Sequence, residues 1–161
     1  MKVLFATPEL APWMKSGGLG EISWSLPAAL LAAGVDARIL VPAYTPLLAA
    51  FPKARLVADL APAGGELPAS RLLEAKTDSG VSLLLLDCPA FFQRTGTAYL
   101  DADGIDFTDN HLRFGLLSKS KRTASKRDGS EFAMRRITLN NSDTSFKGSS
   151  VKGFQRFLLT S

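Results

Sequence analysis

A glycine-rich stretch near the N-terminus, residues 15–21 (KSGGLGE), holds the residues best suited to chemistry in this chain. Gly17 and Gly18 lack a Cβ, so the backbone there can approach a ligand closely. Lys15 adds a positive charge, and a helix starting here would direct free N–H groups and the positive end of its dipole at the same place. Together these features suit a phosphate or pyrophosphate. The alternative is a plain turn with a solvated lysine, because a short Gly-rich loop alone is a weak motif.

The segments on either side of this stretch predict a strand–loop–helix–strand unit. Residues 2–7 contain the apolar run 3–6 and are followed by Pro8, and residues 37–41, apolar except for Arg38, are followed by Pro42. Such short runs are typical of buried strands. We expect the two strands to be parallel with a right-handed crossover. Ligands in such sheets bind beyond the carboxyl ends of the strands, where the loop 8–20 lies.

The helix predicted between these strands begins at Leu19 and stops at Gly34. Pro27 lies inside it, removes one backbone hydrogen bond, and is expected to kink the helix or loosen a turn. The apolar positions expected to face the sheet have helical spacing: Leu19, Ile22, Leu26, Leu30 and Ala33.

Apolar runs and turn residues predict the remaining elements in the same way. They are a short helix at 44–51, strands at 54–60 and 70–76, a central buried strand at 81–86 and one helical turn at 90–94. Asp109 or Asn110 is expected to cap a further helix that starts with residues 112–117. The fold class predicted from this order is α/β.

Three other features are given structural roles. His111 is the only histidine, so it forms neither a metal site nor a catalytic triad, and we expect it at the surface or at a helix cap. Cys88 lies in an apolar run and is interpreted as a small buried hydrophobe. The acidic stretch 95–110 lacks the spacing of a calcium loop and is interpreted as a solvated loop. We therefore predict no metal site.

Charge divides the chain into two parts. Residues 1–117 contain nine Lys and Arg against twelve Asp and Glu, a net charge of −3, whereas residues 118–161 contain ten against three, a net charge of +7. All nine prolines lie at or before Pro89, and nine of the last 44 residues are serine. We predict a domain over 1–117 and a basic, Ser-rich, irregular tail over 118–161. The single cysteine and the short N-terminal apolar run indicate a cytoplasmic protein without a membrane segment.

Four blocks of sequence resemble the N-terminal part of bacterial glycogen synthase, the starch-synthase type that uses ADP-glucose. Together they cover about residues 1–117. The blocks are ATPELAPWMKSGGLGE (6–21), SLPAAL leading to GVDARILVPAY (25–44), LLLLDCPAFFQR (83–94) and YLDADGIDFTDNHLRF (99–114). Two mild departures are Ser16 and Glu21, where the family usually has threonine and aspartate.

The resemblance implies two Rossmann-like domains with an active site in the cleft between them. It implies transfer of glucose from ADP-glucose to the non-reducing end of an α-1,4-glucan such as glycogen, with retention of configuration and without a further cofactor. Lys15 would contact the sugar nucleotide, and Gly17 and Gly18 would let the backbone approach its phosphates. A fixed cation with aligned N–H groups would stabilise the negative charge that grows on the departing ADP.

The resemblance stops at about Lys119. The family's other sugar-contacting histidine and the Arg, Lys and Glu of its C-terminal domain have no counterparts, so we interpret 118–161 as foreign to the family, as a frameshift would produce. We expect an incomplete Rossmann-like domain without catalytic residues, inactive alone and with at most weak nucleotide-sugar binding. Exposed sheet edges predict poor solubility. The basic tail is the one feature that could attract nucleic acid, but it lacks a recognised motif, so no such partner is expected.

Overall fold

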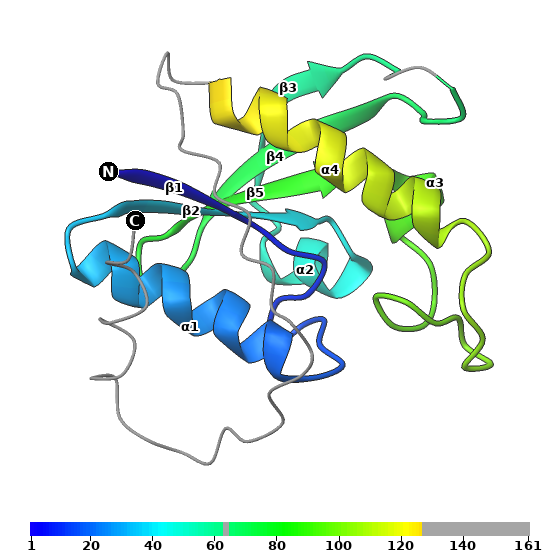
Figure 1. Ribbon diagram of the computed structural model, residues 1–161, viewed down its shortest axis with the longest axis horizontal. Coiled ribbons are helices and arrows are strands. Elements are labelled where there is room, and N and C mark those ends of the chain that lie inside the picture. The colour runs from blue at the N-terminus through cyan, green and yellow to red at the C-terminus, as the bar shows by residue number, and fades with distance from the viewer. Residues whose placement is uncertain (63–64, 127–161) are drawn as a thin grey trace, which may run out of the picture.

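The computed structural model describes residues 1–62 and 65–126, which build a five-stranded sheet with helices on both of its faces (Figure 1). The strand order is β1-β2-β5-β4-β3. Strands β1, β2 and β5 are parallel to one another, and β4 and β3 continue the sheet in antiparallel pairing. The strands are β1 (Lys2–Ala6), β2 (Asp36–Pro42), β3 (Arg55–Leu60), β4 (Ser70–Lys76) and β5 (Ser82–Asp87). The predicted α/β class and the parallel pairing of the first two strands are confirmed.

The centre of the core is β5, flanked by β2. The four consecutive leucines 83–86 are at most 1% exposed, as expected for a strand covered on both faces. Ile39 and Val41 of β2 are fully buried beside them. The alternation of polar and apolar residues that marks a half-exposed strand is therefore absent from β5.

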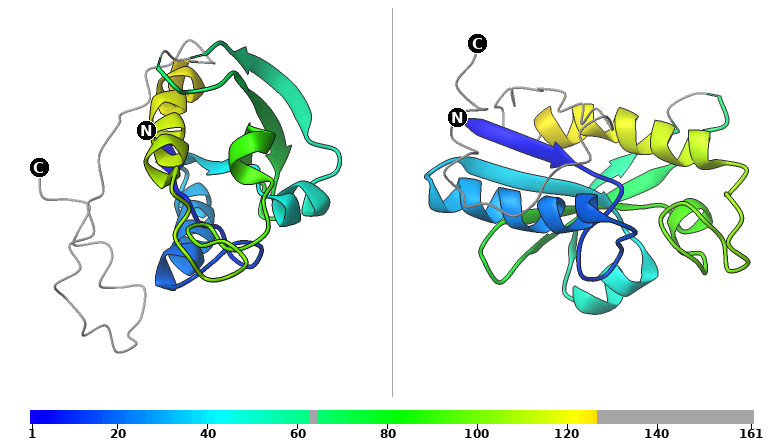
Figure 2. Two further views of the ribbon diagram at one scale, coloured as in Figure 1. Left: turned by 90° about the vertical axis from the view of Figure 1, so that its right-hand side faces the viewer. Right: turned by 60° about the horizontal axis from the view of Figure 1, so that its bottom comes forward.

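Two long helices cover opposite faces of the parallel half of the sheet (Figure 2). Helix α1 (Gly18–Ala32) connects β1 to β2 and packs on β2, whereas α4 (Asn110–Lys126) lies across β1, β2 and β5. The short helices α2 (Thr45–Ala50) and α3 (Pro89–Phe92) follow the carboxyl ends of β2 and β5. Consequently the loops at the carboxyl ends of the parallel strands gather at one end of the sheet, where the Gly-rich stretch also lies (Figure 1).

The face of α1 that contacts the sheet differs from the prediction. Its buried residues are Gly20, Ser23 and Pro27, and the helix continues through Pro27. The residues predicted to be buried lie on a flank of the helix instead, where Ile22 is 37% exposed and the others are partly or largely exposed: Leu19, Leu26, Leu30 and Ala33. Gly20, Ser23 and Pro27 occupy the inner face because their small side chains let the helix backbone lie close to β2.

The predicted boundary between residues 117 and 118 also requires correction, because α4 crosses it without a break and continues to Lys126. Residues 118–126 are therefore helical rather than irregular. The physical reason is that the buried face of α4 continues past Ser118 through small side chains, with Ser120 4% and Ala124 0% exposed. The remainder of the predicted basic tail, 127–161, lies outside the described residues.

Other predictions concern single residues. Cys88 is a free, buried cysteine, and His111 lies at the surface near the start of α4, as expected. Within 1–62 and 65–126, no helix is both long and apolar enough to cross a membrane. The same residues contain no group of three or more His, Cys, Asp or Glu side chains arranged to hold a metal ion.

Candidate functional site

The start of the loop between β1 and α1 is held against the body of the domain by hydrogen bonds of Thr7 and Pro8. Thr7 donates its backbone N–H to Leu40 of β2 at 2.9 Å, and its hydroxyl lies 2.8 Å from that of Ser23 in α1. The Tyr44 hydroxyl donates to the Pro8 carbonyl at 2.9 Å. The loop is therefore fixed relative to the carboxyl ends of β1 and β2.

Trp13 anchors the tip of this loop. Its ring packs edge-on against Trp24 of α1, with centroids 5.2 Å apart, and against Phe51 at 5.1 Å. Edge-to-face contacts at these distances are favourable beyond the area that they bury. The backbone of residues 10–14 closes on itself, since Leu10 and Met14 form an antiparallel bridge. The loop that leads into the Gly-rich stretch is thus a packed structure rather than an open turn.

Glu9 is the electrostatic centre of the loop. Its side chain is buried, and its carboxylate accepts hydrogen bonds from the backbone N–H and hydroxyl of Ser16, at 3.0 and 2.8 Å. The Tyr99 hydroxyl donates to the same carboxylate at 2.7 Å. Burial acts to raise the pKa of Glu9, but these hydrogen bonds and one from the Gly17 backbone outweigh it and hold the pKa below its ordinary value. Glu9 is therefore an ionised carboxylate that fixes the start of the Gly-rich stretch.

The three glycines of the stretch have different surroundings. A Cβ placed on Gly17 or Gly18 would meet no atom within 4 Å, so the backbone at the start of α1 faces open space. No side chain caps α1 at Gly17. A Cβ on Gly20, in contrast, would lie 2.6 Å from the Lys15 Cβ. Gly17 and Gly18 leave room for a ligand at a helix N-terminus, whereas Gly20 leaves room for Lys15.

Lys15 stands at the edge of this open space. Its ammonium forms an ion pair with Glu21 in the first turn of α1, with Nζ and Oε1 2.5 Å apart. The two side chains are 48% and 59% exposed, and an ion pair that is so exposed contributes little to stability. The ammonium is consequently held beside the helix N-terminus by a contact that an anionic ligand can replace.

The segment between α3 and α4 brings Tyr99 to Glu9. Asn110, the first residue of α4, donates to the Tyr99 carbonyl at 2.9 Å. Tyr99 itself keeps its proton, because burial and the adjacent Glu9 carboxylate raise the pKa of its hydroxyl. It is therefore a hydrogen-bond donor to Glu9 and cannot act as a base there.

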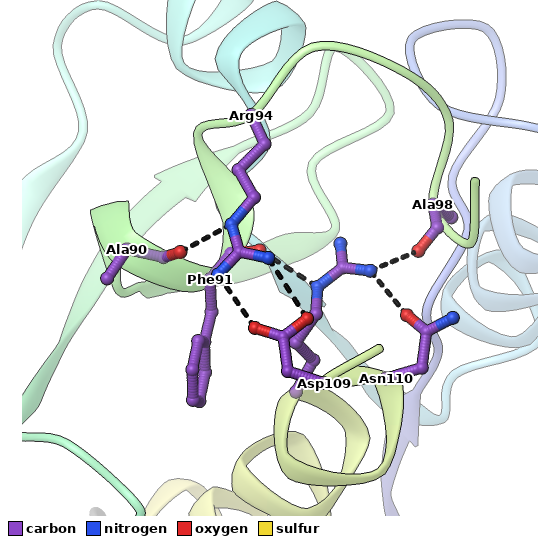
Figure 3. Close-up of polar contacts among 7 residues, drawn as sticks. Ala90, Phe91, Arg94, Ala98, Asp109 and Asn110 are labelled. Atoms are coloured by element: carbon purple, nitrogen blue, oxygen red, sulfur yellow. Dashed lines mark hydrogen bonds and ion pairs between the residues drawn. The ribbon is translucent and has the colours of Figure 1, made fainter. Parts of the chain in front are cut away.

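Two arginines hold this segment through hydrogen bonds and an ion pair (Figure 3). Arg113 is 1% exposed and donates to the carbonyls of Phe91 and Ala98, at 2.9 and 3.1 Å, and to the Asn110 side chain at 2.6 Å. Arg94 makes a bidentate ion pair with Asp109, at 3.0 and 2.7 Å. The first helical turn of α4 thus holds the backbone that precedes Tyr99, at Phe91 and Ala98.

The structure brings together the three residues predicted for the site, because Lys15, Gly17 and Gly18 surround the N-terminus of α1. The prediction did not single out Glu9, Tyr99 or Arg113. It grouped Gly20 with Gly17 and Gly18 as room for a ligand, whereas the structure shows that Gly20 leaves room for Lys15. Glu9 carried a usable signal, since it is a carboxylate in an otherwise apolar run before the Gly-rich stretch. Tyr99 and Arg113 carried none in the sequence, because their role depends on contacts between distant segments.

Comparison with known proteins agrees with this geometry. Residues 2–138 match the model of the family described as starch synthase catalytic domain. The chain belongs to this family. The match extends past the boundary predicted at 117, as α4 also does.

Curated relatives support the same family. The chain is 55% identical over 118 residues to glycogen synthase of Aromatoleum aromaticum, which covers 73% of this chain and 24% of the relative. It is 56% identical over 119 residues to glycogen synthase of Dechloromonas aromatica, covering 74% of this chain and 24% of the relative. The chain therefore spans about a quarter of the length of these relatives.

A solved structure shares the fold. The catalytic domain of starch synthase IV from Arabidopsis thaliana, bound to ADP and acarbose, has a TM-score of 0.59 to this chain at 22% sequence identity. The likeness covers 80% of this chain and 26% of that one. The Rossmann-like architecture predicted from the sequence is confirmed by this likeness.

Proposed function

We propose that the start of α1 is the donor side of a sugar-nucleotide site, with Lys15, Gly17 and Gly18 facing the phosphates of ADP-glucose. The observation that carries the proposal is the uncapped N-terminus of α1, which is open beside both glycines. A helix N-terminus of this kind binds anions through its free N–H groups and its dipole. Lys15 supplies the adjacent full charge.

The reaction proposed for the complete site is transfer of glucose from ADP-glucose to the non-reducing end of an α-1,4-glucan, as in glycogen synthesis, without a metal or further cofactor. The names of the relatives and the ADP and acarbose bound to the Arabidopsis domain support this assignment. Lys15 and the N–H groups of α1 would stabilise the charge that develops on the leaving ADP. The single cysteine, Cys88, favours a cytoplasmic location.

We further propose that this chain alone does not catalyse glucosyl transfer. Glucosyl transfer requires donor and acceptor to be held together, and most of the rate enhancement comes from that positioning. The chain spans about a quarter of its relatives and places its proposed site residues on one side of the donor. A glucan-elongation assay with ADP-glucose and glycogen is expected to give no product above background.

Binding of ADP-glucose, measured by calorimetry, tests the site itself. Replacing Lys15 by alanine is expected to weaken binding about fivefold to tenfold, equivalent to about 1 kcal/mol for one exposed charge. Lys53 is an exposed lysine outside the site, so K53A is the matched control and should bind like the unchanged chain. Equal heats for K15A and the unchanged chain would exclude this loop as the site.

A further inference from the structure

The Glu9 carboxylate lies against the first turn of α1. Its Oε2 would be 3.4 Å from a Cβ placed on Gly20, and the same oxygen accepts the Ser16 N–H at 3.0 Å. The backbone of Gly17 also donates to this carboxylate. The first N–H groups of a helix have no partner within the helix. Glu9 therefore takes N–H groups at the entrance to α1, and those of the first turn, beginning with Gly18, are left for a ligand.

Two hydroxyl groups converge on the other oxygen of this carboxylate. Glu9 Oε1 accepts from Ser16 at 2.8 Å and from Tyr99 at 2.7 Å. Ser16 belongs to the loop that Glu9 holds, so its hydroxyl moves together with that loop. Tyr99 belongs to the segment between α3 and α4, where Asn110 donates to its carbonyl and Arg113 donates to the carbonyl before it (Figure 3). Tyr99 is therefore the donor that fixes Glu9 relative to α4.

Hydrogen bonds rather than a counter-charge hold the negative charge of Glu9. The titratable side chains that face it are Tyr99 and Tyr44, and burial raises the pKa of both hydroxyls, so both stay neutral. The positive charge of Arg113 acts on Tyr44. Lys15 lies beside Glu9 through its Cβ, but its ammonium is paired in the first turn of α1. We therefore expect the carboxylate to loosen and to protonate more easily when the Tyr99 hydroxyl is removed.

We infer that Tyr99 is a positioning residue for the donor phosphates, because its hydroxyl holds Glu9 at the entrance to α1 and so keeps the Gly-rich stretch in place around the ligand. This inference rests on the proposed function of that stretch. Tyr99 acts through Glu9 and does not touch the nucleotide. When the carboxylate loosens, Ser16 and the adjacent Lys15 lose a fixed support, and their ordering must then be supplied during binding. The affinity for the ligand should fall although Lys15 and the glycines are all present.

Calorimetry with ADP-glucose at pH 7 tests the inference on the full chain. Y99F is expected to weaken binding by about threefold to tenfold, and E9Q by a similar factor. The double variant Y99F/E9Q should bind no more weakly than the weaker single variant, because both substitutions act on one hydrogen bond. Y44F is the matched control for the pH profile, since it removes a buried hydroxyl that donates to the Pro8 carbonyl in the same loop and leaves the donors to Glu9 in place.

The pH profile of binding gives a readout that a general loss of packing does not move. Removing one donor raises the pKa of Glu9, so on acidification the affinity of Y99F should begin to fall at a higher pH than that of the unchanged chain. We expect the midpoint of this fall to lie at least about 0.5 pH higher. Y44F should follow the unchanged chain. Y99F/E9Q has no carboxylate at this position and should lack the displaced fall, whereas ADP-glucose itself titrates alike with every variant.

Hydrogen exchange of the Ser16 amide, which donates to Glu9, needs no nucleotide and separates two kinds of failure. This amide should exchange at least about tenfold faster in Y99F than in the unchanged chain or Y44F. The inference is overturned if the amide exchanges alike in Y99F and Y44F, if their pH profiles coincide, or if K15A weakens binding and Y99F does not. Equal binding by K15A and the unchanged chain, with a faster Ser16 amide in Y99F, would instead overturn the proposed function and, with it, the phosphate as the group that Tyr99 serves. If thermal unfolding shows that Y99F is not folded, E9Q decides, because binding by E9Q as tight as by the unchanged chain overturns the inference.

Discussion

The hydroxyl of Tyr99 donates a hydrogen bond of 2.7 Å to the Glu9 carboxylate, across 90 residues of sequence. Glu9 in turn holds Ser16, and α4 holds Tyr99 through Asn110. The Gly-rich stretch is therefore fixed not only by its own turn but by a series of contacts that ends in a helix on the other face of the sheet. A change in α4 should therefore alter the position of the Gly-rich stretch at the proposed phosphate site.

Glu9 makes the free energy of unfolding depend on pH. Its pKa is below the ordinary value in the folded chain, so its ionised form contributes stability above about pH 4.3, the usual value for an unfolded glutamate, and this contribution is lost as the pH falls through the folded pKa. E9Q should unfold more easily than the unchanged chain at pH 7, by about 1–3 kcal/mol. The difference should shrink on acidification. Urea unfolding at pH 7 and pH 4 measures both, with E66Q at an exposed position as control. A difference that is the same at both pH values would show that the Glu9 charge is not responsible.

Two glycines two residues apart in α1 should respond to alanine in opposite ways. G18A adds a Cβ into open space within a helix and should raise stability by up to about 1 kcal/mol. G20A would place its Cβ 2.6 Å from that of Lys15 and should destabilise the chain by about 1–3 kcal/mol. Thermal unfolding distinguishes the two variants. If G20A were as stable as G18A, Lys15 would not be packed against the helix as described.

Glu21 competes with any anion for the Lys15 ammonium. Because the ion pair is exposed and worth at most about 1 kcal/mol, E21Q should strengthen ADP-glucose binding by no more than about fivefold. Calorimetry at low ionic strength is the measurement, because salt screens exposed charges. E66Q, remote from the lysine ion pair, should bind like the unchanged chain. Weaker binding by E21Q would mean that Glu21 orients Lys15 rather than competing for it.

Arg113 and Arg94 should differ in how much each contributes to the free energy of unfolding. R113K leaves a single ammonium where a guanidinium satisfied two buried carbonyls and the half-buried Asn110 amide oxygen. A buried carbonyl without a partner costs about 1–3 kcal/mol. We expect R113K to lower the free energy of unfolding by about 2–4 kcal/mol. R94K disturbs a partly exposed pair and should cost less than about 1 kcal/mol. Similar losses for both would show that the burial of the Arg113 guanidinium does not make its contacts the more costly to lose.

Short apolar runs bounded by proline or glycine predicted the positions of the strands well. A strand that is buried on both faces must be apolar along its length, whichever helices cover the sheet. Residues 81–86 are the clearest case. The inner face of α1 was predicted wrongly, since spacing reports which residues are apolar but not how close the helix must come to β2. Gly20, Ser23 and Pro27 permit that approach. Lys15, Gly17 and Gly18 could be proposed from the sequence because their chemistry is local. The contact between Glu9 and Tyr99 could not be, because it joins residues that are distant in the sequence.

The contact between Trp13 and Trp24 joins the only two tryptophans of the chain. Both belong to the segment from β1 through α1, and one of them anchors the loop that leads to the Gly-rich stretch. The intrinsic fluorescence of the protein therefore comes from a single coupled pair of indoles beside the proposed site. A shift of the loop should therefore change the tryptophan emission, so movement at the proposed site can be followed without an added label.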